Sequence, residues 1–193
     1  TGESQLNGTS AASTVAVNTG RLSLGSAGRL ADNAQTTVAS GATLQLNGSD
    51  TVGQLVLAGT LQGSGTLTAA SYTLNSGTAN LDLGSGSLSS TGSSQINNLA
   101  AASSVSVDSG TLTLGAAQRL TALPAVAVAS GATLTLGGDE TLGTLAGAGQ
   151  VALQAFTLRS GVSGDSSFAG VLQGTGGLVK QGSGTFALSG ANT

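Results

Sequence analysis

The sequence predicts an all-β protein, a right-handed parallel β-helix (β-solenoid) of roughly eight or nine coils, each about 20–24 residues long. Three observations predict this fold: short alternating strands, glycine-containing turns between them, and a leucine that recurs at near-regular intervals. One coil cannot bury its own leucines, but coils stacked on one another form a continuous core. The right-handed winding follows the rule for parallel crossover connections. At about 4.8 Å per stacked strand, the rod would be roughly 40 Å long.

The composition argues against other fold classes. Of the 193 residues, 39% are hydrophobic, yet only 2% are aromatic and 7% are charged, so the apolar residues are chiefly Ala, Val and Leu. Disordered chains usually have low hydrophobicity, whereas Leu and Val recur here at regular places. A β-sandwich would usually carry aromatic residues and would not repeat in register over such a length. The 32 glycines and the β-branched residues argue against helices.

The charged and reactive residues exclude several classes of function. The chain has no Cys and no His, so it cannot form disulfides or thiolate metal sites, and it lacks the commonest general base. A net charge of −3 with five scattered Lys and Arg residues provides no surface that neutralises phosphates. No apolar run approaches the length of a membrane-spanning helix. We therefore expect no cofactor, no metal site and no nucleic-acid partner.

The basic unit is a short strand, a turn and a second short strand, as in TVAVNTGRLSLG at residues 14–25. Val15 and Val17 alternate with small residues, and Leu22 and Leu24 alternate in the same way. Between them, Asn-Thr-Gly supplies turn residues. This alternation with a period of two predicts two short strands joined by a tight turn.

The same unit returns 90 residues later as SVSVDSGTLTLG, at residues 104–115. The alignment of the two copies continues from there, since Asp50-Thr51 aligns with Glu140-Thr141 at the same offset. Farther along, SYTLNSG matches AFTLRSG at an offset of 84. We expect one solenoid segment, cut from a longer protein because neither a signal peptide nor an initiator Met is present. Its parts are an internal repeat, approximately 14–88 and 104–172, and a closing unit, 174–193.

Leucines at inward positions indicate the length of a coil. They recur at similar steps along the chain: Leu22, Leu44, Leu67, Leu88, Leu112 and Leu134. Such spacing, with a step of roughly 20–24 residues, is typical of a coil built from two or three short strands with glycine turns.

The acidic residues predict no catalytic pair. Among eight acids, only Asp139 and Glu140 are adjacent, and neighbours on a strand point to opposite faces. Their counterparts in the first copy are Ser49 and Asp50, in a turn-like context. We interpret all of these as solvated turn residues, because a catalytic pair needs two carboxylates that converge on one bond. Without His, a Ser-His-Asp relay cannot be built either, so we expect no enzyme.

Two further patterns have both a functional and a structural interpretation. Arg29 and Arg119 occupy equivalent positions of the repeat. We expect the aliphatic part of each arginine side chain to cover a leucine, and we do not expect the two arginines to form a basic site. TLT occurs at 66–68, 111–113 and 133–135, which could stack threonine pairs on one flat face as in ice-binding solenoids. Arg21 and Gln45 interrupt that array, and Thr is a common exposed strand residue.

The final stretch, GGLVKQGSGTFALSGANT at residues 176–193, resembles the passenger-associated repeat of bacterial autotransporters. That family motif is G-x-L-x-K-x-G-x-G-x-L-x-L-x-G-x-N-T. Phe186 takes an inward position that the family usually fills with Leu. The other motif residues are Gly177, Leu178, Lys180, Gly182, Gly184, Leu188, Gly190, Asn192 and Thr193. The rest of the chain resembles such passengers only in composition, and we expect Lys180 to be an outward charge.

The resemblance implies a Gram-negative protein that crosses the periplasm and then the outer membrane through its own C-terminal β-barrel, which is not in this chain. It implies a passenger that folds as a right-handed β-helix at the cell surface, with the repeat supporting folding and export. We therefore expect a virulence-type adhesin or its stalk, extracellular or on the cell surface, with a host-cell or matrix surface as partner. The alternative is a two-partner-secreted fragment similar to filamentous haemagglutinin. Because uncapped coil ends expose strand edges, we also expect end-to-end self-association.

Overall fold

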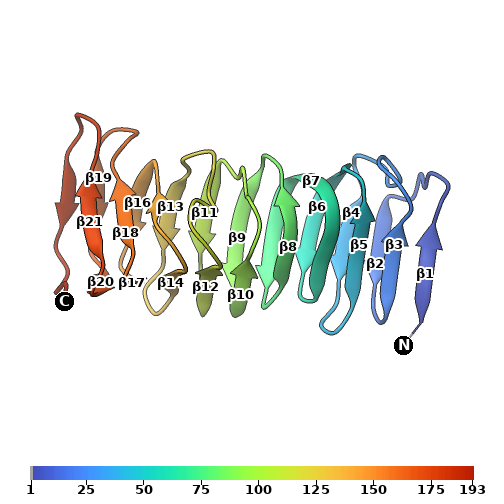
Figure 1. Ribbon diagram of the computed structural model, residues 1–193, viewed down its shortest axis with the longest axis horizontal. Helices are drawn as coiled ribbons and strands as arrows, with labels where there is room; N and C mark the ends of the chain where they lie inside the picture. The colour runs from blue at the N-terminus through green and yellow to red at the C-terminus, as the bar shows by residue number, and fades with distance from the viewer. Residues whose placement is uncertain (1) are drawn as a thin grey trace.

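The computed structural model describes residues 2–193, which form a rod-shaped β-solenoid of ten coils with no helix (Figure 1). The two ends of the chain lie at opposite ends of the rod. All strand pairings between successive coils are parallel. The predicted fold class is thus confirmed, but the predicted number of coils, eight or nine, is too low. Coils 1 to 10 span residues 3–17, 21–38, 43–57, 60–75, 78–91, 93–107, 111–128, 133–147, 150–168 and 171–188.

Each coil passes in turn through three faces of the rod, which we call face 1, face 3 and face 2 in chain order. Face 1 is made of β1 (Glu3–Leu6), β3 (Arg21–Leu24), β5 (Thr43–Asn47), the start of β7 (Thr60–Asn75), β8 (Thr78–Leu83), β10 (Ser93–Ile96), β12 (Thr111–Leu114), β14 (Thr133–Leu136), β17 (Gln150–Gln154) and β20 (Val171–Gly174).

Face 2 is made of β2 (Thr14–Val17), β4 (Gln35–Val38), the end of β6 (Asp50–Leu57), the end of β7, β9 (Ser87–Thr91), β11 (Ser104–Val107), β13 (Ala125–Val128), β16 (Thr144–Gly147), β19 (Ser166–Phe168) and β22 (Phe186–Leu188). Face 3 is less regular, and its strands are the start of β6, the middle of β7, the end of β8, β15 (Glu140–Thr141), β18 (Thr157–Ser160) and β21 (Gly177–Lys180).

The core consists of columns of apolar side chains that stack from coil to coil. Alternation along each short strand sends one set of side chains inward and the other outward, so a strand buries every second residue. On face 1, one inward column runs through Leu22, Leu44, Leu61, Ala79, Ile96, Leu114 and Leu136. The step from Leu44 to Leu61 is shorter than the step from Leu22 to Leu44, so the coils of the rod are not all of one length.

The leucines from which the coil length was predicted do not share a column. Leu22, Leu44, Leu112 and Leu134 lie on face 1, but Leu67 lies on face 3 and Leu88 on face 2. The near-regular steps between these leucines therefore cross between faces. The sequence does not show which face an inward leucine belongs to. Counting leucines of different faces as one column therefore overestimated the length of the shorter coils and underestimated the number of coils.

The 90-residue repeat corresponds to five coils. Ser10 N–H donates to Arg29 O at 2.8 Å, and the equivalent Ala100 N–H donates to Arg119 O at 2.7 Å. Likewise, Gly25 N–H donates to Leu6 O at 2.9 Å, as Gly115 N–H does to Ile96 O at 2.8 Å. Coils 1 and 6 are therefore built alike in these contacts. By contrast, the matching stretches SYTLNSG and AFTLRSG place their strands on different faces, 71–75 on face 2 and 157–160 on face 3.

Candidate functional site

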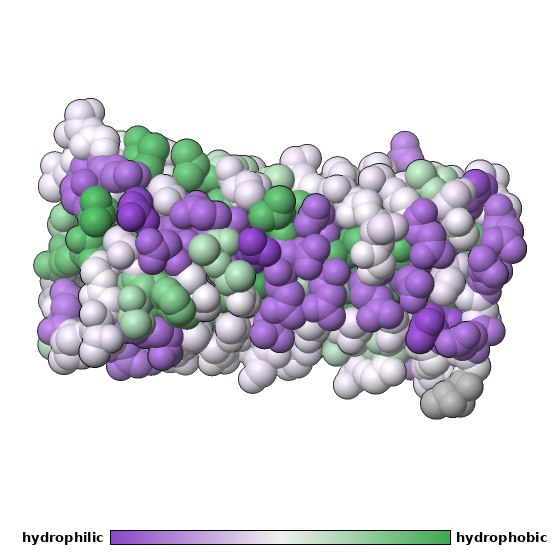
Figure 2. All heavy atoms as spheres, viewed as in Figure 1, coloured by the Kyte–Doolittle hydropathy of each residue, from purple (hydrophilic) through white to green (hydrophobic). Residues whose placement is uncertain are grey.

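The motif residues of the closing stretch lie together in coil 10 and the five residues that follow it. Leu178 on β21 and Phe186 on β22 are half-buried against the core. Leu188 is 38% exposed, because no described residue pairs with the outer edge of β22. Hydrophobic side chains gather toward this end of the rod, while polar and small residues cover most of the rest of the face shown in Figure 2.

Three motif glycines, Gly182, Gly184 and Gly190, allow coil 10 to lie close against the preceding coil. Gly182 has a φ of +67° at the corner after β21, a conformation that favours glycine. A Cβ on Gly190 would lie 2.7 Å from the carbonyl carbon of Gly170, which is closer than side chains approach a backbone. These positions therefore serve the stacking of coils.

Lys180 is exposed, although it lies at an inward position of β21 and not at the outward position expected from the sequence. It pairs with the buried Ser160 and lies on the same side of β21 as Leu178, while Val179 points outward. Its side chain lies against Gly161, and its Nζ donates to the backbone carbonyls of the corner, at 3.0 Å in the case of Gly182. The ammonium group caps a turn at the open end of the rod, and its recorded partners are carbonyl oxygens.

The last two residues cover part of the outer edge of β20. Asn192 Oδ1 accepts a hydrogen bond from Leu172 N–H at 2.9 Å. Thr193 N–H donates to Leu172 O at 3.0 Å, and Thr193 O accepts from Gly174 N–H at 3.2 Å. This short tail thus satisfies backbone groups that an edge strand would otherwise expose.

The structure also shows two buried carboxylates, and both contradict the prediction of solvated turn residues. Asp50 is 4% exposed and Glu140 is 0% exposed. Both occupy inward positions of face 3, five coils apart, where the equivalent positions elsewhere hold leucines such as Leu67 and Leu158. Asp139 is the solvated member of its pair, and it accepts hydrogen bonds from Thr157 N–H at 2.8 Å and from Arg159 Nη1 at 3.3 Å.

Each buried carboxylate accepts hydrogen bonds from backbone groups of the preceding coil. Asp50 Oδ2 accepts from Arg29 N–H at 2.7 Å, and Glu140 Oε2 accepts from Arg119 N–H at 2.7 Å. Glu140 Oε1 also accepts from Thr141 N–H at 3.2 Å. Coils 2 and 7 have no strand on face 3, whereas coils 3 and 8, stacked on them, have one. Backbone N–H groups of coils 2 and 7 therefore lack a strand partner there, and the carboxylate side chain accepts their hydrogen bonds.

Burial raises the pKa of the Glu140 carboxyl, although the backbone donors, Arg119 N–H first among them, act in the opposite direction. The side chain has no access from solvent, and its recorded hydrogen-bond partners are backbone N–H groups. Its geometry is that of a structural cap rather than a catalytic group. A signal for it was present in the sequence, because this is the one position at which both copies of the repeat carry an acid.

The two equivalent arginines make different local contacts. Arg29 Nε donates to Ser26 Oγ at 2.8 Å, whereas Arg119 Nη1 donates to Asn97 O at 2.8 Å. Their backbone N–H groups, not their guanidinium groups, bind the buried carboxylates. The repetition of arginine at this position therefore builds no shared basic site.

The three TLT segments do not form one array. Thr111 and Thr113 stack directly on Thr133 and Thr135 on face 1, but the segment at 66–68 lies on face 3. Beyond this pair of coils, face 1 carries amides that bond along the rod. Gln62 Nε2 donates to Gln45 Oε1 at 3.3 Å, and Asn97 Nδ2 donates to Asn80 Oδ1 at 2.6 Å.

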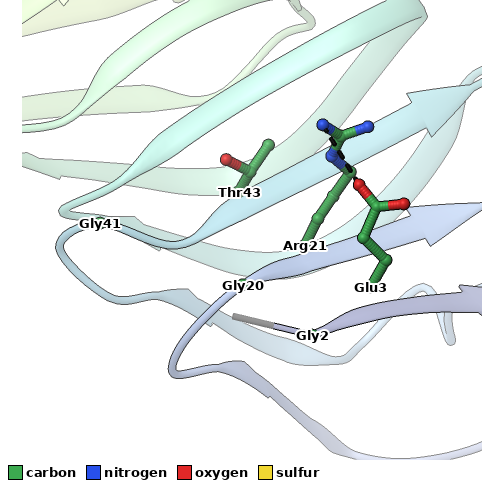
Figure 3. Close-up of a pocket in the computed structure, with 6 residues that line it drawn as sticks. All are labelled: Gly2, Glu3, Gly20, Arg21, Gly41 and Thr43. Atoms are coloured by element: carbon green, nitrogen blue, oxygen red, sulfur yellow. Dashed lines mark ion pairs between the residues drawn. The ribbon is translucent and has the colours of Figure 1, made fainter.

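A shallow hollow at the N-terminal end of face 1 contains an exposed ion pair (Figure 3). Arg21 Nη2 lies 3.5 Å from Glu3 Oε1, and both side chains point outward beside Thr43. Their side chains are 42% and 75% exposed, so water screens the attraction. The equivalent positions five coils on are Ser93 and Thr111, which are uncharged. The hollow lacks the converging groups that a catalytic site needs.

Residues 2–193 contain no cluster of three potential metal ligands. Within the same range, no helix is long and apolar enough to span a bilayer. The features on which a function can be argued are therefore the rod itself, its mostly uncharged faces and its C-terminal coil. Comparisons of the chain with protein-family models, curated proteins and solved structures found no match, so its assignment rests on the fold and residues described above.

Proposed function

We propose that this structural β-solenoid scaffold is a passenger segment of an exported autotransporter, and serves as the stalk or scaffold of a surface-exposed or secreted adhesin rather than as an enzyme. The observation that carries the proposal is the last coil. There the residues that resemble the passenger-associated repeat form the face 3 and face 2 strands of coil 10 and the tail that binds the edge of β20, with Gly182, Gly184 and Gly190 packed against the preceding coil.

The rest of the rod supports a route that requires transport of an unfolded chain. The absence of Cys prevents disulfides from forming in an oxidising periplasm, and small, mostly uncharged side chains suit passage through a narrow pore. Each coil pairs only with its neighbours, so folding can proceed stepwise as the chain emerges. The protein's own outer-membrane β-barrel and a host-cell or matrix surface are the partners that this proposal requires.

The proposal is tested by surface display of the full-length gene product. Replacing Leu178, Phe186 and Leu188 with Asp places charges at core positions of coil 10, so we expect surface display to fall strongly. Val179→Asp is the matched control, because Val179 is 41% exposed and points away from the core. Display can be measured by protease accessibility on whole cells. If the triple variant were displayed as well as the control, a role of coil 10 in export and folding would be wrong.

A two-partner-secreted adhesin similar to filamentous haemagglutinin is the alternative, because it would have the same fold with a separate transporter. The parent open reading frame distinguishes the two, since only an autotransporter encodes a β-barrel in the same chain. Ice binding is the minor alternative, carried by the two stacked threonine pairs on face 1. A thermal-hysteresis assay tests it, and we expect no activity because the array is two coils deep.

A further inference from the structure

An Asn-Gly pair occupies the corner of coil 3 at which the chain turns from face 1 to face 3. Asn47 is the last residue of β5 and is exposed, and Gly48 follows it in the turn that leads to β6. Coil 2 lies on one side of this corner and coil 4 on the other, so it belongs to the interior of the rod. Because glycine has no Cβ, its backbone nitrogen is unobstructed next to the side-chain amide of the preceding asparagine.

The stacking of coils requires the glycine of this pair. A Cβ on Gly48 would lie 2.6 Å from the backbone nitrogen of Ala27 in coil 2. The equivalent Gly138 in the second copy would collide in the same way with the backbone of coil 7. The residue before it differs, because the counterpart of Asn47 is Gly137. The fold therefore needs a glycine at position 48 but no asparagine before it, and the second copy has no Asn-Gly pair at this corner.

Both groups of the pair are accessible for reaction. Among the described residues, the Gly48 N–H group has no recorded hydrogen-bond acceptor. The recorded hydrogen bond of the Asn47 side chain comes from Gln45 Nε2, which donates to Asn47 Oδ1 at 3.4 Å and leaves Nδ2 without a recorded partner. In the other Asn-Gly pair of the chain, at 7–8, the side-chain amide packs against Gly25 of the next coil.

Another exposed asparagine is held in place by hydrogen bonds that Asn47 lacks. Asn75 also ends a strand, β7, but Ser76 follows it. Ser76 N–H donates to Thr91 O at 3.0 Å, and Thr91 Oγ1 donates to Asn75 Oδ1 at 3.3 Å. Coil 5 thus holds both the backbone nitrogen and the side-chain amide, so the two groups cannot approach each other without breaking these hydrogen bonds.

We propose that Asn47 is a self-modification site, at which the chain converts its own asparagine to aspartate and isoaspartate. The Gly48 nitrogen, deprotonated by hydroxide, attacks Cγ of Asn47, the bond from Cγ to Nδ2 breaks, and ammonia leaves a cyclic succinimide. Water then opens the ring at Cγ, which gives aspartate, or at the main-chain carbonyl, which gives isoaspartate. One water is consumed and one ammonia is released, and no atom is oxidised or reduced.

The isoaspartate product disturbs the cap on coil 2. Its main chain runs through Cβ and is longer by one carbon, at the corner that leads to Asp50. Asp50 Oδ2 accepts from Arg29 N–H at 2.7 Å, and Ser49 O accepts from Gly28 N–H at 3.1 Å. The added carbon moves these acceptors away from their donors, so the contact between coils 2 and 3 on face 3 loosens. The second copy keeps its cap, because position 137 has no side chain to react.

Peptide mapping tests the site. The purified protein is incubated in mildly alkaline buffer made with heavy-oxygen water, and isoaspartate is measured by methyl transfer with an isoaspartyl methyltransferase. We expect position 47 to become a mixture of aspartate and isoaspartate that carries heavy oxygen, while Asn75 stays unchanged. The rate should rise with pH, because the attacking nitrogen must lose its proton. Asn47→Gln is the matched control, since it keeps an exposed amide but its longer side chain closes the ring far more slowly.

Hydrogen exchange tests the effect on the cap. The Arg29 amide donates to Asp50, and the Arg119 amide donates to Glu140 in the same way. We expect the Arg29 amide to exchange faster in aged protein than in fresh protein, and the Arg119 amide to exchange equally in both. Asn47→Asp separates the causes, because it adds the charge without lengthening the main chain, so its Arg29 amide should stay protected.

Three results would each overturn the proposal. The first is a folded protein, checked by circular dichroism, in which Asn47 does not convert or converts no faster than Asn75. The second is a product at position 47 with aspartate but no isoaspartate, since a succinimide opens at either carbonyl. The third is equal exchange of the Arg29 amide in aged and fresh protein. No step depends on where the protein is located, so these results leave the export proposal to its own test.

Discussion

At the scale of single residues, the buried carboxylates of Asp50 and Glu140 carry the most information. Each lies in a core position and accepts backbone N–H groups from the coil before it. A leucine there would fill the space but leave those donors unsatisfied, which costs roughly 1–3 kcal/mol for each buried group. The acid therefore occurs in both copies because the backbone of the preceding coil needs an acceptor.

The pH dependence of stability should reveal this burial. Because burial raises the pKa of Glu140 in the folded state, folding is coupled to proton uptake at this group. Its contribution is complete below the pKa of the unfolded carboxyl and is lost as pH rises through the folded pKa. We expect the difference in unfolding free energy, wild type minus Glu140→Gln, to fall as pH rises above the ordinary pKa of a Glu carboxyl, about 4. Urea titrations at several pH values measure it.

Asp139→Asn is the control, because its effect on the unfolding free energy should change with pH in the opposite direction. The Thr157 N–H group, together with Arg159, holds the pKa of Asp139 below its usual value. The contribution of Asp139 to stability is present above the pKa of the unfolded carboxyl and is lost as pH falls through the lower folded pKa. The difference in unfolding free energy, wild type minus Asp139→Asn, should therefore rise with pH up to the ordinary pKa of an Asp carboxyl, about 4. A Glu140 difference that rose in the same way would show that the carboxylate is not desolvated.

At the scale of elements, corners decide how tightly one coil follows the next. β7 runs through all three faces in 16 residues, and Gly63 makes its first corner with a φ of +123°. A Cβ at Gly63 would lie 2.9 Å from the backbone nitrogen of Leu46, its partner in the coil below. Gly41 also has a positive φ, +77°, but its Cβ direction faces open space.

Replacing these two glycines with alanine separates the effects of conformation and contact. We expect Gly41→Ala to lower the free energy of unfolding by about 1 kcal/mol, the cost of a left-handed conformation alone. Gly63→Ala should cost about 3 kcal/mol or more, because the methyl group also collides with the backbone of coil 3. Urea denaturation of both variants and the wild type measures this. Equal costs would mean that the corner of β7 can move away from coil 3.

At the scale of the whole molecule, the protein is a one-dimensional stack. Among the described residues, the strand pairings join each coil to the next one along the rod. Its stability is then approximately a sum over coils and the interfaces between them. Coils in the middle have two such interfaces, whereas coils 1 and 10 have one, apart from the tail over β20.

Hydrogen exchange should therefore be graded along the rod. Gly25 and Gly115 donate equivalent hydrogen bonds, the first to coil 1 and the second to coil 6. We expect the amide of Gly25 to exchange faster, because coil 1 opens without disturbing the interior. Native-state exchange followed by nuclear magnetic resonance measures both rates in one sample. Equal protection of the two amides would mean that the rod opens only as a whole.

The sequence by itself determined the fold class, the main strands and the 90-residue repeat. These follow from local patterns: alternation at Val15 and Val17, turn residues such as Gly20, and a register that returns after 90 residues. A side-chain period and a turn preference act within a few residues, so they can be recognised without knowing where the chain goes next.

Only the tertiary structure decided which face each strand joins, and hence the number of coils. Leu44 and Leu67 have the same local pattern, yet they face the core from different sides. It also decided that Glu140 is buried while the adjacent Asp139 is solvated, and that Lys180 covers a turn at the inward side of its strand. The physical reason is the same in each case, because burial depends on the coil stacked above or below, and that neighbour lies a whole coil away in the chain.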